Sequence, residues 1–180
     1  DNQQNLLRYF VFFFSFRQTD RIQLEMQLIS SFLELLQSVA THSDNCRTLL
    51  ITNPNFKVIN NLFGLLQCSV HPNIKGSLFS AITAFASPEY ASTISDILLS
   101  SQIFQSPSPT ILNPKPNETG IKYELEEIES KYETYKECKA FLALILQLII
   151  ATGSSHKVQG ISKNVAFQPY LRFIADSVFL

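Results

Sequence analysis

The sequence predicts an all-α protein built from stacked helices. Apolar residues recur at spacings of three and four along most of the chain, and no convincing run alternates as a half-buried strand does. Short breaks that contain Pro or Asn separate these runs. The chain is 46% hydrophobic and 16% charged, which is typical of a folded protein rather than a disordered one.

The first element is an aromatic run, YFVFFFSF, at residues 9–16. It is too short to span a membrane, which requires about 20 apolar residues. Phe, Tyr and Val also favour strands, but the helical pattern around the run makes a buried helix the preferred interpretation. A hydrophobic tip that dips into lipid stays open as an alternative.

Residues 20–41 carry the clearest helical pattern, with two adjacent apolar stripes. One stripe consists of Ile22, Met26, Ile29, Leu33 and Leu36, and the other of Leu28, Phe32, Leu35 and Val39. An apolar surface this wide predicts a helix that packs on two neighbours. Thr19 or Asp20 is the expected N-cap.

Four shorter helices are expected before residue 100. The first covers about 44–51 and is opened by Ser43 or Asp44, and Pro54 starts the second, which ends near Gln67.

The third of these helices, at about 73–86, has one apolar stripe, made of Ile74, Leu78, Ile82 and Phe85. The fourth runs to about residue 100, with Ser87 as N-cap and Pro88 in the first helical position.

A Pro- and Ser-rich loop then divides the chain. Residues 101–119 contain four prolines and break the helical pattern. We therefore expect residues 1–100 to form stacked solenoid helices and residues 120–180 to continue the same solenoid. The later helices are expected at about 120–151 and 168–180.

The predicted architecture is an irregular α-solenoid segment of antiparallel helix pairs, in the style of HEAT or armadillo repeats. Wide apolar faces and short connections favour such a stack over a compact bundle. The chain does not begin with Met and closes on a helical pattern without a stop signal. We therefore expect a fragment of a longer polypeptide.

Composition and motifs argue against several function classes. The net charge is -1 without a basic block, so direct nucleic-acid binding is not expected. The three cysteines and three histidines lack the spacing of metal ligands. The wide separation of the cysteines also argues against a disulfide framework, so we expect free thiols. The five glycines form no phosphate or dinucleotide cradle. We expect no transmembrane segment, no cofactor, no metal and no small-molecule substrate.

The acidic run ELEEIES at 124–130 raises the question of an active site. Two of the carboxylates of Glu124, Glu127 and Glu133 could pair as acid and base or bind two metal ions. However, no Glu of the chain is followed by His three residues later, as helical di-metal sites require.

The apolar residues of this region instead indicate a structural role for the run. They form one helical stripe, made of Ile121, Leu125, Ile128, Tyr132 and Tyr135. We expect this stripe to pack, while the acids face solvent or cap neighbouring helices. The lysines within helical reach of the acids are Lys122, Lys131 and Lys136.

Two linked motifs in the last third of the chain resemble a known family. GIKYELEEIESKYETYKECKAFLALILQLI, followed after a loop by QPYLRFIADSVFL, is similar to the large α-solenoid scaffold nucleoporins of the nuclear pore inner ring. The residues that match the first motif are Gly120, Ile121, Glu124, Leu125, Glu127, Ile128, Glu129, Ser130, Tyr135, Ala140 and Phe141. Those of the second motif are Pro169, Tyr170, Leu171, Phe173, Asp176, Ser177, Val178, Phe179 and Leu180.

The resemblance implies a structural, non-enzymatic superhelix within a much longer chain at the nuclear envelope. It implies that the partners are other inner-ring nucleoporins, including linker nucleoporins bound as short segments in surface grooves. Such a scaffold would support pore assembly and the transport of protein and mRNA. We expect an extended partner segment in a groove lined by Phe and Leu. The motifs assign a binding or catalytic role to none of their residues.

Two alternatives stay open. One is an independent adaptor with armadillo- or HEAT-like repeats that binds peptides outside the pore. The other is a helical metal-dependent hydrolase that uses Glu124 and Glu127.

Overall fold

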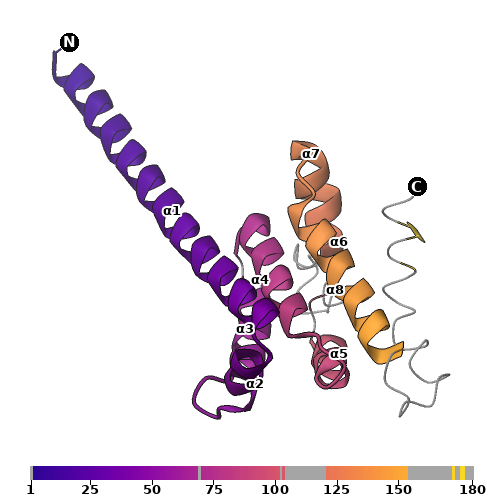
Figure 1. Cartoon of the computed structure of the whole chain (residues 1–180). Coiled ribbons are helices and arrows are strands. Elements are labelled where there is room, and N and C mark those ends of the chain that lie inside the picture. Colours follow the sequence, from indigo (N-terminus) through magenta and orange to yellow (C-terminus); the bar gives the residue numbers. More distant parts are fainter. Residues whose placement is uncertain are drawn as a thin grey trace, which may run out of the picture.

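The computed structural model describes the backbone of residues 2–68, 70–101, 103, 121–153, 172 and 175–176. Side chains are described from Ile22 onward, apart from Lys122 and Gly153. The regular elements are α1 (Asn2–His42), α2 (Asp44–Thr52), α3 (Val58–Leu66), α4 (Pro72–Phe85), α5 (Ala91–Ser100), α6 (Ile121–Tyr123), the π-helix η1 (Glu124–Glu129), α7 (Ser130–Tyr132) and α8 (Lys136–Gly153) (Figure 1). The predicted class, an all-α segment of α-solenoid type, is confirmed.

Helix α1 is longer than the sequence pattern predicted. It includes residues 9–16, so the helical interpretation of the aromatic run is confirmed for the backbone. The burial of that run lies outside the described side chains. The predicted N-cap at Thr19 or Asp20 is wrong, because the helix passes through both residues. No Gly or Pro lies between residues 2 and 42 to end it earlier.

The break after α2 differs from the prediction at Pro54. Ser43 caps α2 as expected, since its side chain accepts a hydrogen bond from the Cys46 N–H. Pro54 lies in a turn rather than in a helix, and the Asn53 side chain accepts from the N–H of Asn55 at 2.9 Å. Helix α3 begins only at Val58.

The start of α5 also differs from the prediction. Residues 88–90 form a turn, and the helix begins at Ala91. Ser87 does not cap with its side chain, because its buried hydroxyl oxygen has no hydrogen-bond partner among the described residues. Its carbonyl oxygen instead accepts from the N–H groups of Tyr90 and Ala91, at 3.0 and 2.8 Å.

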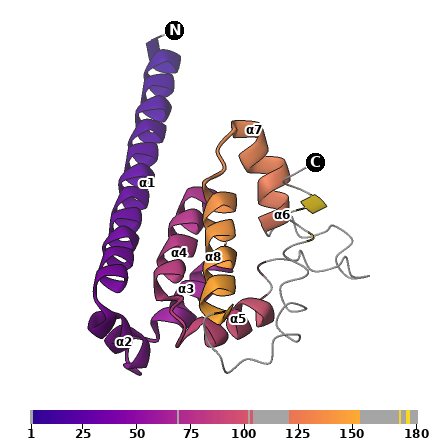
Figure 2. The same cartoon turned by 45° about the vertical axis from the view of Figure 1, so that its right-hand side comes forward.

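Helix α4 is the centre of the stack, with α1 on one side and α8 on the other (Figures 1 and 2). Its N-terminus is capped by the His71 side chain, which accepts from the Asn73 N–H at 3.1 Å. The four residues of its predicted stripe, Ile74, Leu78, Ile82 and Phe85, are all buried. Phe79 packs edge to face on Phe141 of α8, with ring centroids 5.5 Å apart.

Helices α4 and α8 run in the same direction. Gly76 near the start of α4 lies against Lys136 at the start of α8, and Ala86 after α4 accepts a 3.1 Å hydrogen bond from Gln147. Residue numbers therefore rise together along the two helices. Residues 121–132 precede α8 in the chain and run antiparallel to it (Figure 2). Sequential antiparallel pairs whose long helices lie side by side are the arrangement expected of a solenoid.

Candidate interaction groove and buried carboxylate cluster

An apolar groove with a volume of about 940 Å³ lies between α1, α2 and α3. Both predicted stripes of α1 contribute to one wall, which includes Leu28, Phe32, Leu35, Leu36 and Val39. The opposite wall is formed by Leu50, Phe56, Val58, Leu62 and Leu65. Among the lining residues only Asn61 is polar, and its side-chain amide donates to the carbonyl oxygen of Phe56 at 2.9 Å.

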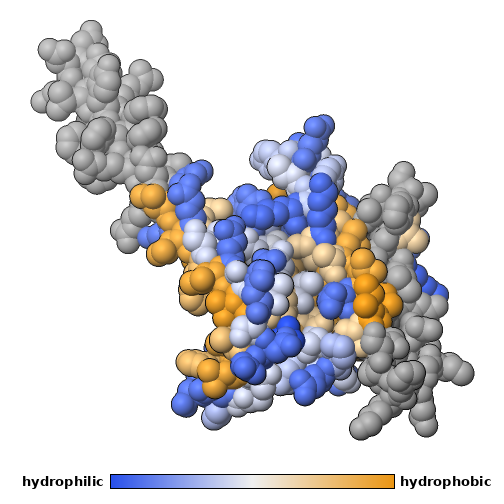
Figure 3. Space-filling model, in the orientation of Figure 1, coloured by the Kyte–Doolittle hydropathy of each residue, from blue (hydrophilic) through white to orange (hydrophobic). Residues whose placement is uncertain are grey.

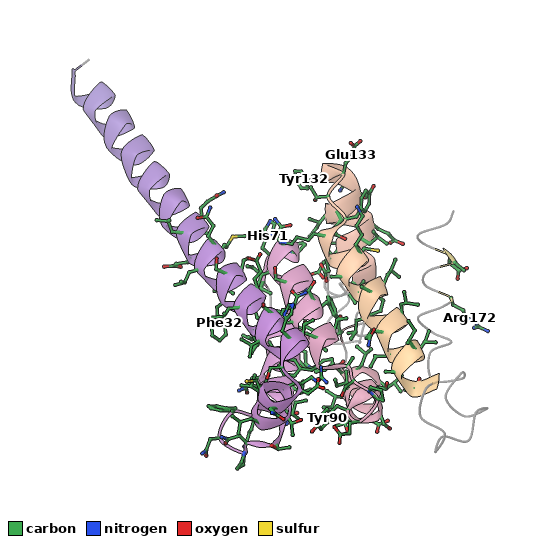
Figure 4. The ribbon with its side chains drawn as sticks, in the orientation of Figure 1. Phe32, His71, Tyr90, Tyr132, Glu133 and Arg172 are labelled. Carbon is green, nitrogen blue, oxygen red and sulfur yellow. The ribbon has the colours of Figure 1, made fainter. Side chains whose placement is uncertain are left out.

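The groove is open because, among the residues that the structure describes, helices cover α1 on one side only. Leu33 and Ala40 of α1 are buried in the core, whereas Leu28 and Phe32 are 72% and 62% exposed. Phe32 points away from the stack on the outer side of α1 (Figure 4), and an apolar surface follows that side of the molecule (Figure 3). The sequence predicted that this helix packs on two neighbours. Among the described residues, the groove lies on the side of α1 where the second neighbour was expected.

A second cavity, of about 460 Å³, is more polar and lies between α1, α4 and α8. Its polar side chains are largely satisfied by nearby backbone carbonyls. Thr83 donates to Phe79 at 2.8 Å, Ser80 donates to Gly76 at 2.9 Å, and Arg47 donates to Ala40 at 3.1 Å. We therefore regard this cavity as a solvated junction between helices rather than as the functional site.

The predicted carboxylates divide into two groups. Glu126, Glu127 and Glu133 are exposed, as expected (Figure 4 shows Glu133 at the turn after α7). Glu124 and Glu129 are buried. The sequence predicted that the acids of this run face solvent or cap neighbouring helices, and this is wrong for Glu124, which instead pairs with Lys75 in the interior. Glu137 of α8, which is also buried, lies with them in one cluster.

The buried cluster contains one cation. The Lys75 ammonium of α4 forms a salt bridge with Oε1 of Glu124, and both side chains are at most one-tenth exposed. Oε2 of Glu124 and both side-chain oxygens of Glu137 find no donor among the described residues. A proton on Glu137 supplies a donor that can be directed at Glu124.

Burial and the Glu124 carboxylate favour that protonated form of Glu137. Burial first, then a hydrogen bond with Glu124 and its negative charge, raise the pKa of Glu137 to about 9, although Lys75 acts in the opposite direction. The cluster at neutral pH therefore holds Glu137 as a neutral acid beside the salt bridge between Lys75 and Glu124.

Glu129 has the capping role that the sequence suggested for some of these acids. Its carboxylate accepts hydrogen bonds from the backbone N–H groups of Glu137 and Cys138, at 2.7 and 3.0 Å. These are orphan donors in the first turn of α8, where the helix dipole also favours an anion. Burial raises the pKa of Glu129, while the two backbone hydrogen bonds lower it.

The π-helix explains why Glu124 and Glu129 share one buried side. In an α-helix, residues five apart point about 140° away from each other, at 3.6 residues per turn. In a π-helix hydrogen bonds join residues i and i+5, so side chains five apart lie nearly above one another. In η1 the Ser130 N–H accordingly bonds to the carbonyl oxygen of Leu125.

The carboxylates proposed for catalysis are not brought together. Glu124 faces Lys75 in the interior, whereas Glu127 is exposed and pairs with Lys131 at 2.6 Å. In the part of the chain that the structure describes, no group of three His, Cys, Asp or Glu residues could hold a metal ion. Burial and the nearby Glu129 and Glu137 raise the pKa of the Cys138 thiol to about 11, so this cysteine stays protonated and unreactive.

The family-motif residues of the first segment lie mainly in the core. Ile121, Leu125 and Phe141 are buried, Ile128 is half-buried, and Ser130 is exposed. The expected packing of the apolar stripe is wrong for Tyr132 and Tyr135, which are both exposed. The helical run ends at Glu133, whose φ of 52° turns the chain before Tyr135. Gly120 and the second motif lie outside the described residues, except for Asp176, which is exposed. The sequence did not indicate Lys75, because 49 positions separate it from Glu124.

No helix in the described part of the chain combines the length and hydropathy that a membrane span requires. Among known proteins, residues 20–180 match the family described as "Nuclear pore complex scaffold, nucleoporins 186/192/205". The chain is 37% identical over 160 residues to the human "Nuclear pore complex protein Nup205", covering 88% of this chain and 8% of that protein. It is 27% identical to the Drosophila melanogaster protein of the same name, covering 88% of this chain and 7% of that protein.

Proposed function

Since the chain belongs to the family of nuclear pore complex scaffold nucleoporins 186, 192 and 205, we propose that it is part of a structural subunit of the inner ring. In this proposal the whole protein resides at the nuclear envelope, holds other nucleoporins in place, and thereby supports the transport of protein and mRNA. The chain spans about a twelfth of the length of the human relative, and in this proposal it contributes one binding surface to that scaffold.

The observation that carries the proposal is the groove between α1, α2 and α3. Monomeric proteins rarely leave a continuous apolar surface of this kind uncovered, and such surfaces mark sites of protein interaction. Leu28, Phe32 and Leu65 are all at least 47% exposed there. A catalytic role receives no comparable support, because Glu124 and Glu127 face different environments.

Affinity purification of the tagged full-length protein from gently lysed cells tests the scaffold function. We expect inner-ring nucleoporins in near-stoichiometric amounts, and a fluorescent fusion at the nuclear rim. Recovery of soluble cargo or signalling proteins without pore subunits would instead favour the adaptor.

Two exposed positions allow a matched test of the groove. Leu65→Glu places a charge in the groove, whereas Leu99→Glu places one on α5, which does not line it. We expect the first variant to lose one or more nucleoporins that the second retains.

A further inference from the structure

Residues 121–133, which comprise α6, η1, α7 and the turn residue after them, are attached to the stack largely through charged groups. Four of the described side chains of this segment are buried, and two of the four are carboxylates. The four are Ile121, Glu124, Leu125 and Glu129. Tyr132 and Glu133 are exposed at the outer end of the segment (Figure 4). Charged side chains are rarely buried unless they are paired, so the position of the segment depends on the partners of its two buried glutamates.

The backbone of the segment adopts two conformations that need support from their surroundings. Glu124–Glu129 form a π-helix, which is rare and is frequently found at functional sites. Glu133, which leads into the turn before α8, is left-handed, with φ 52° and ψ 32°. Sparsely populated conformations persist only where neighbouring structure holds them. The contacts that hold this one include the salt bridge between Lys75 and Glu124 and the two hydrogen bonds from α8 to Glu129.

Helix α8, by contrast, is fixed by its apolar side chains. Phe141, Leu144 and Leu148 are fully buried, and Phe79 of α4 packs on Phe141. Glu137 lies in the first turn of this anchored helix, so it cannot reach water without moving the core. A change in the charge of Glu137 is therefore accommodated more easily by movement of residues 121–133 than by movement of α8.

Glu137 lies among charged groups from two neighbouring elements, Glu124 and Glu129 of η1 and Lys75 of α4. Neither oxygen of Glu137 nor Oε2 of Glu124 has a donor among the described residues. A proton on Glu137 can join these two carboxyl groups by a hydrogen bond. Without that proton, three buried carboxylates share Lys75, and the two that face each other repel in an interior of low dielectric constant.

We propose that residues 121–133 form a proton-gated clasp, which a proton shared by Glu137 and Glu124 keeps closed on α4 and α8. When this proton passes to the solvent, the segment moves into water while the rest of the helical stack stays folded. Opening hydrates the Glu124 carboxylate and uncovers the first turn of α8, whose N–H groups Glu129 caps in the closed form. The clasp requires no partner, so it does not rest on the proposed scaffold function.

The clasp opens as the pH rises. Burial first, and then the hydrogen bond with Glu124 and its negative charge, raise the pKa of Glu137 to about 9 in the closed form. In the open form Glu137 is hydrated and separated from Glu124, so its pKa returns toward the ordinary value of 4.5. Because the open form binds the proton more weakly, the ratio of open to closed protein rises by at most about tenfold per pH unit between these values.

Hydrogen–deuterium exchange of the full-length protein, followed by mass spectrometry, measures the opening. Peptides that cover residues 121–138 report on the clasp, and peptides from α4 report on the core of the stack. Each rate is divided by that of an unstructured chain at the same pH, which removes the pH dependence of the exchange chemistry. Glu137→Gln keeps a donor beside Glu124 but has no proton to lose. Glu127→Gln is the matched control, because it changes an exposed carboxylate of the same segment.

The protection of residues 121–138 should fall by about tenfold to a hundredfold from about pH 6.5 to pH 8.5 in the unmodified protein and in Glu127→Gln. It should stay level in Glu137→Gln. At each pH it should also be at least about tenfold lower than the protection of α4, because the clasp opens without the rest of the stack.

Two kinds of result would overturn the clasp. An equal fall of protection in Glu137→Gln, or protection in the unmodified protein that does not change with pH, would show that the Glu137 proton does not hold the segment. Equal protection of α4 and of residues 121–138 at each pH would show that the segment opens only when the whole stack unfolds. The pH series and the comparison with α4 are made in the unmodified protein, so they decide the question even if Glu137→Gln does not fold.

Discussion

Glu129 in the π-helix accepts a 3.0 Å hydrogen bond from the backbone N–H of Cys138, nine residues later in the chain. The same carboxylate also accepts a 2.7 Å hydrogen bond from the Glu137 N–H. Glu129 therefore caps the N-terminus of α8, although it does not belong to that helix. The capping group is thus fixed by tertiary structure, because η1 must lie against α8 for the bonds to form. This contact joins η1 to α8 across the short helix α7 and satisfies donors that would otherwise be buried without partners.

Glu129→Ala should destabilise the protein by about 1–3 kcal/mol, because two buried N–H donors of α8 lose a charged acceptor. Urea unfolding of the purified protein, followed by circular dichroism, measures the loss. Glu127→Ala serves as the control, since it removes a carboxylate that is exposed and forms a surface ion pair with Lys131. Equal losses in the two variants would show that the cap does not contribute as the geometry indicates.

The pH dependence of stability should report the proton on Glu137. The pKa of this group is about 9 in the folded protein against an ordinary value of 4.5, so between these values the unfolded chain has lost a proton that the folded chain retains. The contribution of Glu137 to stability is therefore complete below about pH 4.5 and is lost progressively as the pH rises toward 9. The slope from one such proton is at most about 1.4 kcal/mol per pH unit.

Glu137→Gln tests this expectation, because the amide keeps a donor near Glu124 but has no proton to lose. Relative to the unmodified protein, the variant should gain stability steadily from pH 5 to pH 9. Urea unfolding at five or more pH values in this range measures the difference. Parallel curves for the two proteins would mean that Glu137 is already ionised in the folded state.

The parts of the fold that follow a single periodicity could be predicted from the sequence. The stripe of α4 repeats at helical spacing, and all four of its residues are buried. The Ser43 cap of α2 depends only on neighbouring residues, so it too could be read from the sequence. The positions of α3 and α5 were placed too early because the turns at Pro54 and Pro88 resemble helix starts in composition.

The candidate sites could be predicted only in part. Two apolar stripes on α1 indicated a wide contact surface. Which part of that surface is buried depends on where α4 packs on α1, and the sequence does not show this. At α-helical spacing, Glu124 and Glu129 of the acidic run would lie on different sides of the helix. Its π-helical register brings them to one side, where η1 is in contact with α8. Lys75 pairs with Glu124 across 49 positions, which no local pattern reveals.

Lys75→Met should destabilise the protein strongly, by about 3–5 kcal/mol, because Glu124 would remain in the interior without its cation. The double variant Lys75→Met, Glu124→Gln should recover most of this loss, since it leaves no unpaired charge. A double-mutant cycle from urea unfolding gives the coupling energy between the two side chains. Additive losses would show that the salt bridge contributes little in the folded state.

The close approach of α4 and α8 predicts opposite effects for two glycine substitutions. A Cβ added at Gly76 would lie 2.9 Å from the carbonyl oxygen of Lys136, and the neighbouring backbone carbon is also within 3.1 Å. A Cβ at Gly64 in α3 would meet nothing within 4 Å. Both glycines are in helices, where Ala is intrinsically better by about 1 kcal/mol.

Gly64→Ala should therefore stabilise the protein by up to about 1 kcal/mol. Gly76→Ala should destabilise it by about 1–3 kcal/mol despite the same gain in propensity, because the start of α8 must shift away from α4. Such a shift would also disturb the backbone donors that Glu129 caps, since both lie in the turn that follows Lys136. Thermal unfolding of the two variants side by side measures the difference, and stabilisation by both would contradict the close packing of α4 on α8.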